Sequence, residues 1–137
     1  MMTNARWNTR RLYKFESEFR RGDFLNKTLH VDYLRNIASE VWKDLNRSYF
    51  NMPYLPHIRC GRGVPYNGSL YSYYQEDEGI VLARNQRTEL VLYHELTHAL
   101  GFDDHDVAFV SMYFYLLNRY GEVPWWELTQ ARIDYKI

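Results

Sequence analysis

Two histidines and a glutamate stand at a spacing that suits a metal site. In the stretch YHELTHALGFDDHDVAF, residues 93–109, His94 and His98 are four residues apart and Glu95 follows the first of them. Residues four apart on an α-helix leave the same face one turn apart, so both imidazoles can reach one ion. Zinc takes such nitrogen ligands at about 2.0–2.1 Å. The sequence therefore predicts a Zn²⁺ ion bound by His94 and His98.

Glu95 has the position of a general base. It lies beside the predicted ion without being needed as a ligand, where it can take a proton from water and return it to a leaving amine. A catalytic zinc ion has three protein ligands and an open fourth position. The motif thus predicts a zinc metallopeptidase with Glu95 as its catalytic residue and a protein or peptide as its substrate.

Two residues beyond the motif compete to be the third ligand. Gly101 favours the end of the helix and a reversal of the chain. Asp104 then fits the spacing HExxHxxGxxD, and His105 lies one residue further. We favour His105, because imidazole is the commoner zinc ligand and because Asp104 suits the N-cap of the next helix. Asp104 remains the alternative third ligand.

The motif region resembles the SprT-like (Spartan-like) zinc metallopeptidases, specifically over residues 94–109. HELTHAL, a short loop and HDVAF match that family's order of HExxH, loop and a histidine that begins the next helix. His105 and Phe109 occupy its His and Phe positions, whereas Asp106 and Val107 replace the usual Gly-Pro.

That resemblance implies a zincin-like fold in which His94, His98 and His105 bind zinc and Glu95 is the base. The DNA-binding zinc ribbon of longer family members has no counterpart, because Cys60 is the single cysteine.

Two other functions are compatible with the motif. HELTHALGFDDH is similar to the HGxLHLxGYDH pattern of the YbeY-like zinc endoribonucleases, but Glu95 stands where that family has glycine. The other alternative is a non-catalytic binding module that zinc stabilises. Nucleic acid binding has little support, because the basic residues are spread rather than clustered; those near the predicted strands are Arg59, Arg62, Arg84 and Arg87.

The length and composition predict one domain over residues 1–137. No apolar run reaches the length of a signal peptide or a membrane span, and a lone cysteine fits a reducing compartment. We therefore expect a cytoplasmic protein with no membrane partner. The sequence does not indicate an oligomeric state.

Two helices are expected before the motif. Leu12, Phe15 and Phe19 have helical spacing within residues 10–20. A second helix, with Thr28 as its expected N-cap, carries an apolar stripe that steps by three or four residues: Val31, Leu34, Ile37, Val41, Leu45 and Tyr49.

Short strands are expected between these helices and the motif, over residues 57–60, 69–74 and 79–83. Tight turns between strands favour a small antiparallel sheet. We expect GIVLA, residues 79–83, to be an edge strand that could bind an extended peptide. The tyrosines of 69–74 are expected to be half-buried.

The remaining chain is expected to be helical except at its end. A motif helix over 88–100 would be capped by Thr88, and the third-ligand helix would run from Asp104–Asp106 to about Tyr120. Its expected buried face is Val107, Val110, Phe114 and Leu117. Trp125 and Trp126 would begin a short helix and close the core, and the tail RIDYKI alternates like an edge strand. The predicted class is α+β.

Overall fold

The computed structural model of the chain describes residues 5–19, 25–48, 50–52 and 54–137, without the side chains of 5–7. Within these ranges the helices are α1 (Ala5–Glu18), α2 (Val31–Ser48), α3 (Glu89–Ala99), α4 (Val107–Arg119) and α5 (Trp125–Tyr135). The strands are β1 (Ile58–Gly61), β2 (Val64–Tyr66), β3 (Ser69–Tyr71), β4 (Tyr73–Gln75) and β5 (Gly79–Ala83). The α+β class is confirmed.

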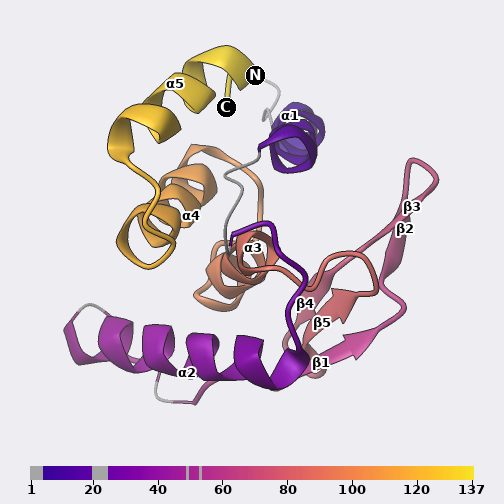
Figure 1. Cartoon of the computed structure of the whole chain (residues 1–137), viewed down its shortest axis with the longest axis vertical. Helices are drawn as coiled ribbons and strands as arrows, with labels where there is room; N and C mark the ends of the chain where they lie inside the picture. Colours follow the sequence, from indigo (N-terminus) through magenta and orange to yellow (C-terminus); the bar gives the residue numbers. More distant parts are fainter. Residues whose placement is uncertain (1–4, 20–24, 49, 53) are drawn as a thin grey trace.

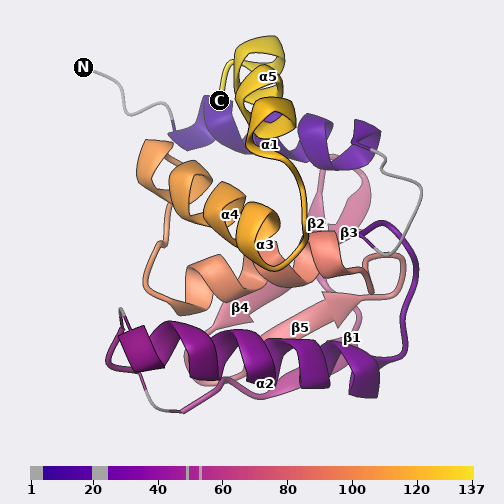
Figure 2. The same cartoon turned by 60° about the vertical axis from the view of Figure 1, so that its left-hand side comes forward.

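The helices are stacked around α3, which lies in the middle of the molecule (Figure 1). The helix α2 packs against α3 and β1 on one side, while α4 packs against α3 on another. The helices α1 and α5 contact each other and lie on the side of α3 opposite to α2 (Figure 2). None of the described helices is both long enough and apolar enough to cross a membrane.

The sheet differs from the prediction of an antiparallel sheet. Its strand order is β1-β5-β4, and β5 pairs parallel with β1 and antiparallel with β4. GIVLA is therefore the central strand, and the prediction that it forms an edge is wrong. All five of its residues are buried. A continuous apolar run suits such a strand, because it has neighbours on both sides and covered faces.

The segment 69–74 forms two strands rather than one. Between β3 and β4 lies Ser72, whose Oγ accepts a hydrogen bond from Ala83 N–H at 2.8 Å. The amide of Ser72 donates to Gln86 Oε1 at 2.6 Å. These side-chain contacts interrupt the predicted strand at Ser72. The part before it, β3, pairs with β2, and the part after it, β4, pairs with β5. The turn of that hairpin is Asn67-Gly68, with φ of 47° and 81°, a pair that favours two-residue hairpins.

The predicted apolar faces of α1 and α2 pack into one core. Leu12 and Phe15 of α1 are fully buried, as are Leu34 and Leu45 of α2. Tyr49 and residue 20 lie outside the described residues. The helix α2 begins at Val31, so Thr28 is not its N-cap; there, His30 Nδ1 accepts a hydrogen bond from Asp32 N–H at 3.1 Å.

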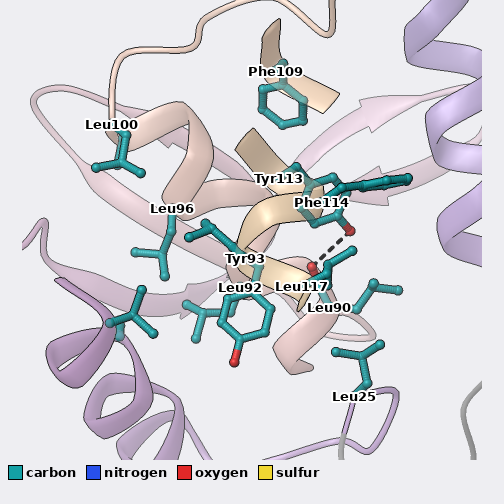
Figure 3. Close-up of a cluster of buried hydrophobic side chains, with 14 of the residues drawn as sticks. Leu25, Leu90, Leu92, Tyr93, Leu96, Leu100, Phe109, Tyr113, Phe114 and Leu117 are labelled. Atoms are coloured by element: carbon teal, nitrogen blue, oxygen red, sulfur yellow. Dashed lines mark hydrogen bonds between the residues drawn. The ribbon is translucent and has the colours of Figure 1, made fainter. Parts of the chain in front are cut away.

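The helix α3 is buried on nearly all sides, and its side chains form the centre of the core (Figure 3). Thr88 caps it, as predicted, by accepting a hydrogen bond from Val91 N–H. Gly101 follows its C-cap with a φ of 109°, which favours glycine. Tyr113 of α4 donates a hydrogen bond to Leu90 O at 3.1 Å and so joins the two helices.

Three predictions about the C-terminal region are wrong. The tail is not a strand: α5 runs to Tyr135, because Leu128, Ala131 and Tyr135 have helical spacing. Leu128 and Ala131 are the buried residues of that helix, whereas Trp125 and Trp126 are exposed. Val107 is exposed as well, because it is the first residue of α4; Val110, Phe114 and Leu117 are buried as expected.

Candidate metal centre

Three histidines, two of them on α3, lie close together. The Nε2 atom of His105 lies 3.0 Å from Nε2 of His94 and 3.0 Å from Nε2 of His98. Their ligand atoms lie close enough together to bind one metal ion. His94 and His98 come from successive turns of α3, and His105 comes from the loop between α3 and α4.

The other ring nitrogen of each histidine has an oxygen partner. His94 Nδ1 lies 2.6 Å from Glu16 Oε2, and His98 Nδ1 lies 2.7 Å from the carbonyl oxygen of Phe102. His105 Nδ1 lies 2.7 Å from Thr9 Oγ1. Since a carbonyl oxygen only accepts, His98 carries its proton on Nδ1 and its Nε2 lone pair is free for a ligand. The same arrangement of outer partners is usual for metal-binding histidines.

The geometry fits a tetrahedral ion. Zinc–nitrogen distances of about 2.0–2.1 Å in a tetrahedron place the ligand nitrogens about 3.3 Å apart, close to the 3.0 Å separations found here. Neutral imidazoles whose lone pairs face one another repel, and a cation between them removes that repulsion. Three nitrogen donors are the set that zinc and other first-row metals favour.

Glu95 lies beside this centre and is 3% exposed. Its Oε1 atom has no hydrogen-bond partner among the described residues, which is unusual for a buried carboxylate oxygen. An unsatisfied oxygen of a residue that lines the cleft could accept a hydrogen bond from a water molecule or a substrate. Glu95 thus has the placement of a general base, as the motif predicts, although its role stays a prediction.

The electrostatics of the site also favour a cation. Burial lowers the pKa of His94 to about 3, of His98 to about 4 and of His105 to about 2, so all three rings are neutral ligands. Burial raises the pKa of Glu16 to about 8 and the pKa of Glu95 well above its usual range, and the nearby Glu16 carboxyl group raises the pKa of Glu95 further. A divalent cation at the Nε2 atoms would favour the ionised form of both carboxyl groups.

The three histidines and Glu95 line a cleft of about 370 Å³. Its remaining walls come from α1, the hairpin, β4 and the loop after α3: Tyr13, Val64, Ser72, Tyr73, Tyr74 and Asp103. None of the described residues that line it is lysine or arginine. The predicted half-burial of Tyr71, Tyr73 and Tyr74 is confirmed.

Asp104, the alternative third ligand, is exposed and is not among the residues that gather at the site. It is not the N-cap of α4 either. That cap is Asp106, whose side chain accepts a hydrogen bond from Phe109 N–H at 3.0 Å. The cap of the helix therefore lies two residues after Asp104, at the end of the predicted range for its start, and His105 lies in the loop before the helix rather than in its first turn.

We expect Asp106→Ala to lower the free energy of unfolding by about 1 kcal/mol, because the amide of Phe109 in the first turn of α4 loses its side-chain acceptor. Asp104→Ala is the matched control and should change it by less than about 0.5 kcal/mol. Urea unfolding with a chelator present measures the two variants without a contribution from bound metal. A larger loss for Asp104→Ala would contradict this assignment of the cap.

Sequence reasoning missed two residues of the site, Thr9 and Glu16. Both lie on α1, where their contacts with His105 and His94 span 96 and 78 residues of sequence. Helical spacing could have placed them on one face of α1, since they are seven residues apart. Nothing in the sequence indicates which part of the molecule that face would meet.

No family model, curated protein or solved structure matches this chain.

Proposed function

We propose that this protein is a zinc-dependent metallopeptidase with a zincin-like arrangement of its motif helix, similar to the SprT-like enzymes. One observation carries the proposal: three histidine Nε2 atoms converge beside a buried glutamate whose Oε1 is unpartnered, at the wall of an open cleft. Three imidazoles leave a tetrahedral ion one position for water or substrate.

The zinc ion, when bound, would supply a Lewis acid that acidifies water and polarises the scissile carbonyl. His94, His98 and His105 would bind it through Nε2. Glu95 would accept the proton of the attacking water and then donate it to the leaving amine. Burial raises the pKa of Glu95 in the metal-free site, and the charge of a bound cation would oppose this and favour the ionised form that can accept a proton.

The cleft favours a peptide over RNA. Asp103 and Glu95 are acidic, and the described lining contains no basic side chain that could bind phosphates. None of the four arginines considered from the sequence lines it, and Arg59 instead pairs with Glu78 at 3.1 Å. The aromatic rings of Tyr13, Tyr73 and Tyr74 provide contact surface for apolar or cationic side chains.

The strand β4 is the part of the sheet that could bind an extended peptide, in place of GIVLA. It is an edge strand of the three-stranded sheet, and Tyr73 and Tyr74 line the cleft with the histidines. A peptide could bind to this edge through main-chain hydrogen bonds. It would then lie beside the metal centre.

A metal and substrate assay tests the proposal. The zinc-loaded protein should contain one zinc per chain and cleave an unfolded protein such as reduced casein, and a chelator should stop that cleavage. A structured RNA incubated with the same preparation should stay intact. Cleavage of RNA but not protein would favour the endoribonuclease, and one bound zinc with neither activity would favour the binding module.

A further inference from the structure

One face of α1 is directed at the metal centre. Thr9, Tyr13 and Glu16 are spaced four and three residues apart, which places them on the same side of a helix. Thr9 contacts His105 and Glu16 contacts His94. Between them, the Tyr13 ring lies 5.7 Å from the ring of His105 and 6.0 Å from that of His94, measured between centroids.

The carboxylate of Glu16 is itself held in place. The Tyr113 hydroxyl of α4 lies 2.8 Å from Glu16 Oε2, the same oxygen that lies 2.6 Å from His94 Nδ1. The side chain of Glu16 is 11% exposed, and that of His94 is 3% exposed. A buried oxygen fixed between α1, α3 and α4 leaves the imidazole of His94 little freedom to turn.

The same helix also holds one wall of the cleft. Tyr13 stacks on Tyr71 of the hairpin, with ring centroids 4.2 Å apart and planes inclined by 13°. Tyr66 packs edge-on against Tyr13 at 5.1 Å. Val64, at the base of that hairpin, lines the metal cleft. Displacement of α1 would therefore disturb two ligands and a wall of the cleft at once.

We propose that α1 is an integral part of the metal centre, in which Glu16 and Thr9 are positioning residues that hold His94 and His105 with Nε2 toward the ion. Metal binding and the docking of α1 then stabilise each other. The proposal rests on the metal site of the proposed function but not on peptide hydrolysis. Loss of an outer partner of this kind typically lowers metal affinity by about 10- to 100-fold.

Zinc affinity, measured by competition with a chromophoric chelator, tests the positioning role. Glu16→Gln and Thr9→Val should each weaken binding by about 10- to 100-fold. Thr9→Ser keeps the hydroxyl and should restore binding to within about threefold of wild type. With cobalt in place of zinc, the visible spectrum of Glu16→Gln should shift, because the orientation of a ligand has changed.

The chain offers matched controls for both substitutions. Glu18→Gln makes the same change on α1, at an exposed carboxylate that accepts a hydrogen bond from Tyr135. Thr129→Val makes the other change at an exposed position of α5. Neither residue contacts the histidines, so both variants should bind zinc and cobalt like wild type.

Hydrogen exchange of the full chain tests the reciprocal effect. Saturating zinc should slow the exchange of the α1 amides in wild type, and by a smaller factor in Glu16→Gln, since coupling between two events acts equally in both directions. The amides of α2, which lies on the side of α3 opposite to α1 (Figure 2), provide the internal reference.

Three results would overturn the proposal while wild type binds zinc: unchanged affinity in Glu16→Gln and Thr9→Val, failure of Thr9→Ser to restore binding, or equal α1 exchange with and without zinc. If Glu16→Gln does not fold by circular dichroism, the Thr9→Val and Thr9→Ser pair decides the outcome. A wild-type chain that binds no zinc would instead contradict the metal site of the proposed function.

Discussion

Glu95→Gln is expected to lower the rate of peptide hydrolysis by about a hundredfold to ten-thousandfold and to leave zinc binding intact. Glutamine has the shape of glutamate, so the packing of this buried side chain on α3 is kept. An amide cannot accept a proton from the attacking water, which removes the general base. Initial rates on casein, together with the zinc content of the same preparation, measure the two quantities.

Glu40→Gln, an exposed change on α2, is the control for this substitution and should cleave like wild type. Equal rates for Glu95→Gln and wild type would show that another group, or none, accepts the proton. Loss of zinc together with activity would show that Glu95 acts on the metal site rather than on water.

His105→Ala is expected to weaken zinc binding by more than the roughly hundredfold associated with an outer partner, because a direct ligand is lost. Its Nε2 lies 3.0 Å from those of both other histidines. Asp104→Ala is the matched control, because Asp104 precedes His105 in the sequence, is exposed and is not part of the three-histidine cluster. Competition with a chelator of known affinity gives both dissociation constants.

If Asp104→Ala loses zinc while His105→Ala retains it, the carboxylate is the third ligand and the loop must rearrange on binding. That result would also weaken the resemblance to the SprT-like enzymes, whose third ligand is the histidine.

The motif was predictable because its geometry is local. The spacing of His94 and His98, the cap at Thr88 and the turn at Gly101 all follow from rules that act within one or two turns of a helix. The position of His105 beside His94 and His98 requires only one further feature, the reversal of the chain after Gly101. The start of α4 was misplaced because Asp104 and Asp106 are equally good caps by type, and only the path of the loop distinguishes them.

The features that could not be predicted from the sequence depend on contacts between residues that are far apart in the chain. The parallel pairing of GIVLA with β1 could not be predicted from the sequence, because the β2–β3 hairpin and β4 lie between these two strands in the chain. The tail RIDYKI alternates, but Ala131 and Tyr135 also have helical spacing, and packing of α5 against α1 and α4 favoured the helix. Glu16 and Thr9 could not be assigned to the metal centre for the same reason: their partners lie on α3 and in the loop before α4.

The long stretch of sequence between α1 and its partners has a consequence for synthesis on the ribosome. The ring of Phe15 packs against those of Phe114 and Tyr135, with centroids 5.2 Å and 5.7 Å away. The Thr9 hydroxyl contacts His105, which lies 96 residues later in the sequence. Those partners follow α1 in the chain by 96 residues or more, so they emerge from the ribosome well after it. The apolar face of this helix therefore stays uncovered by these partners until they too have been synthesised.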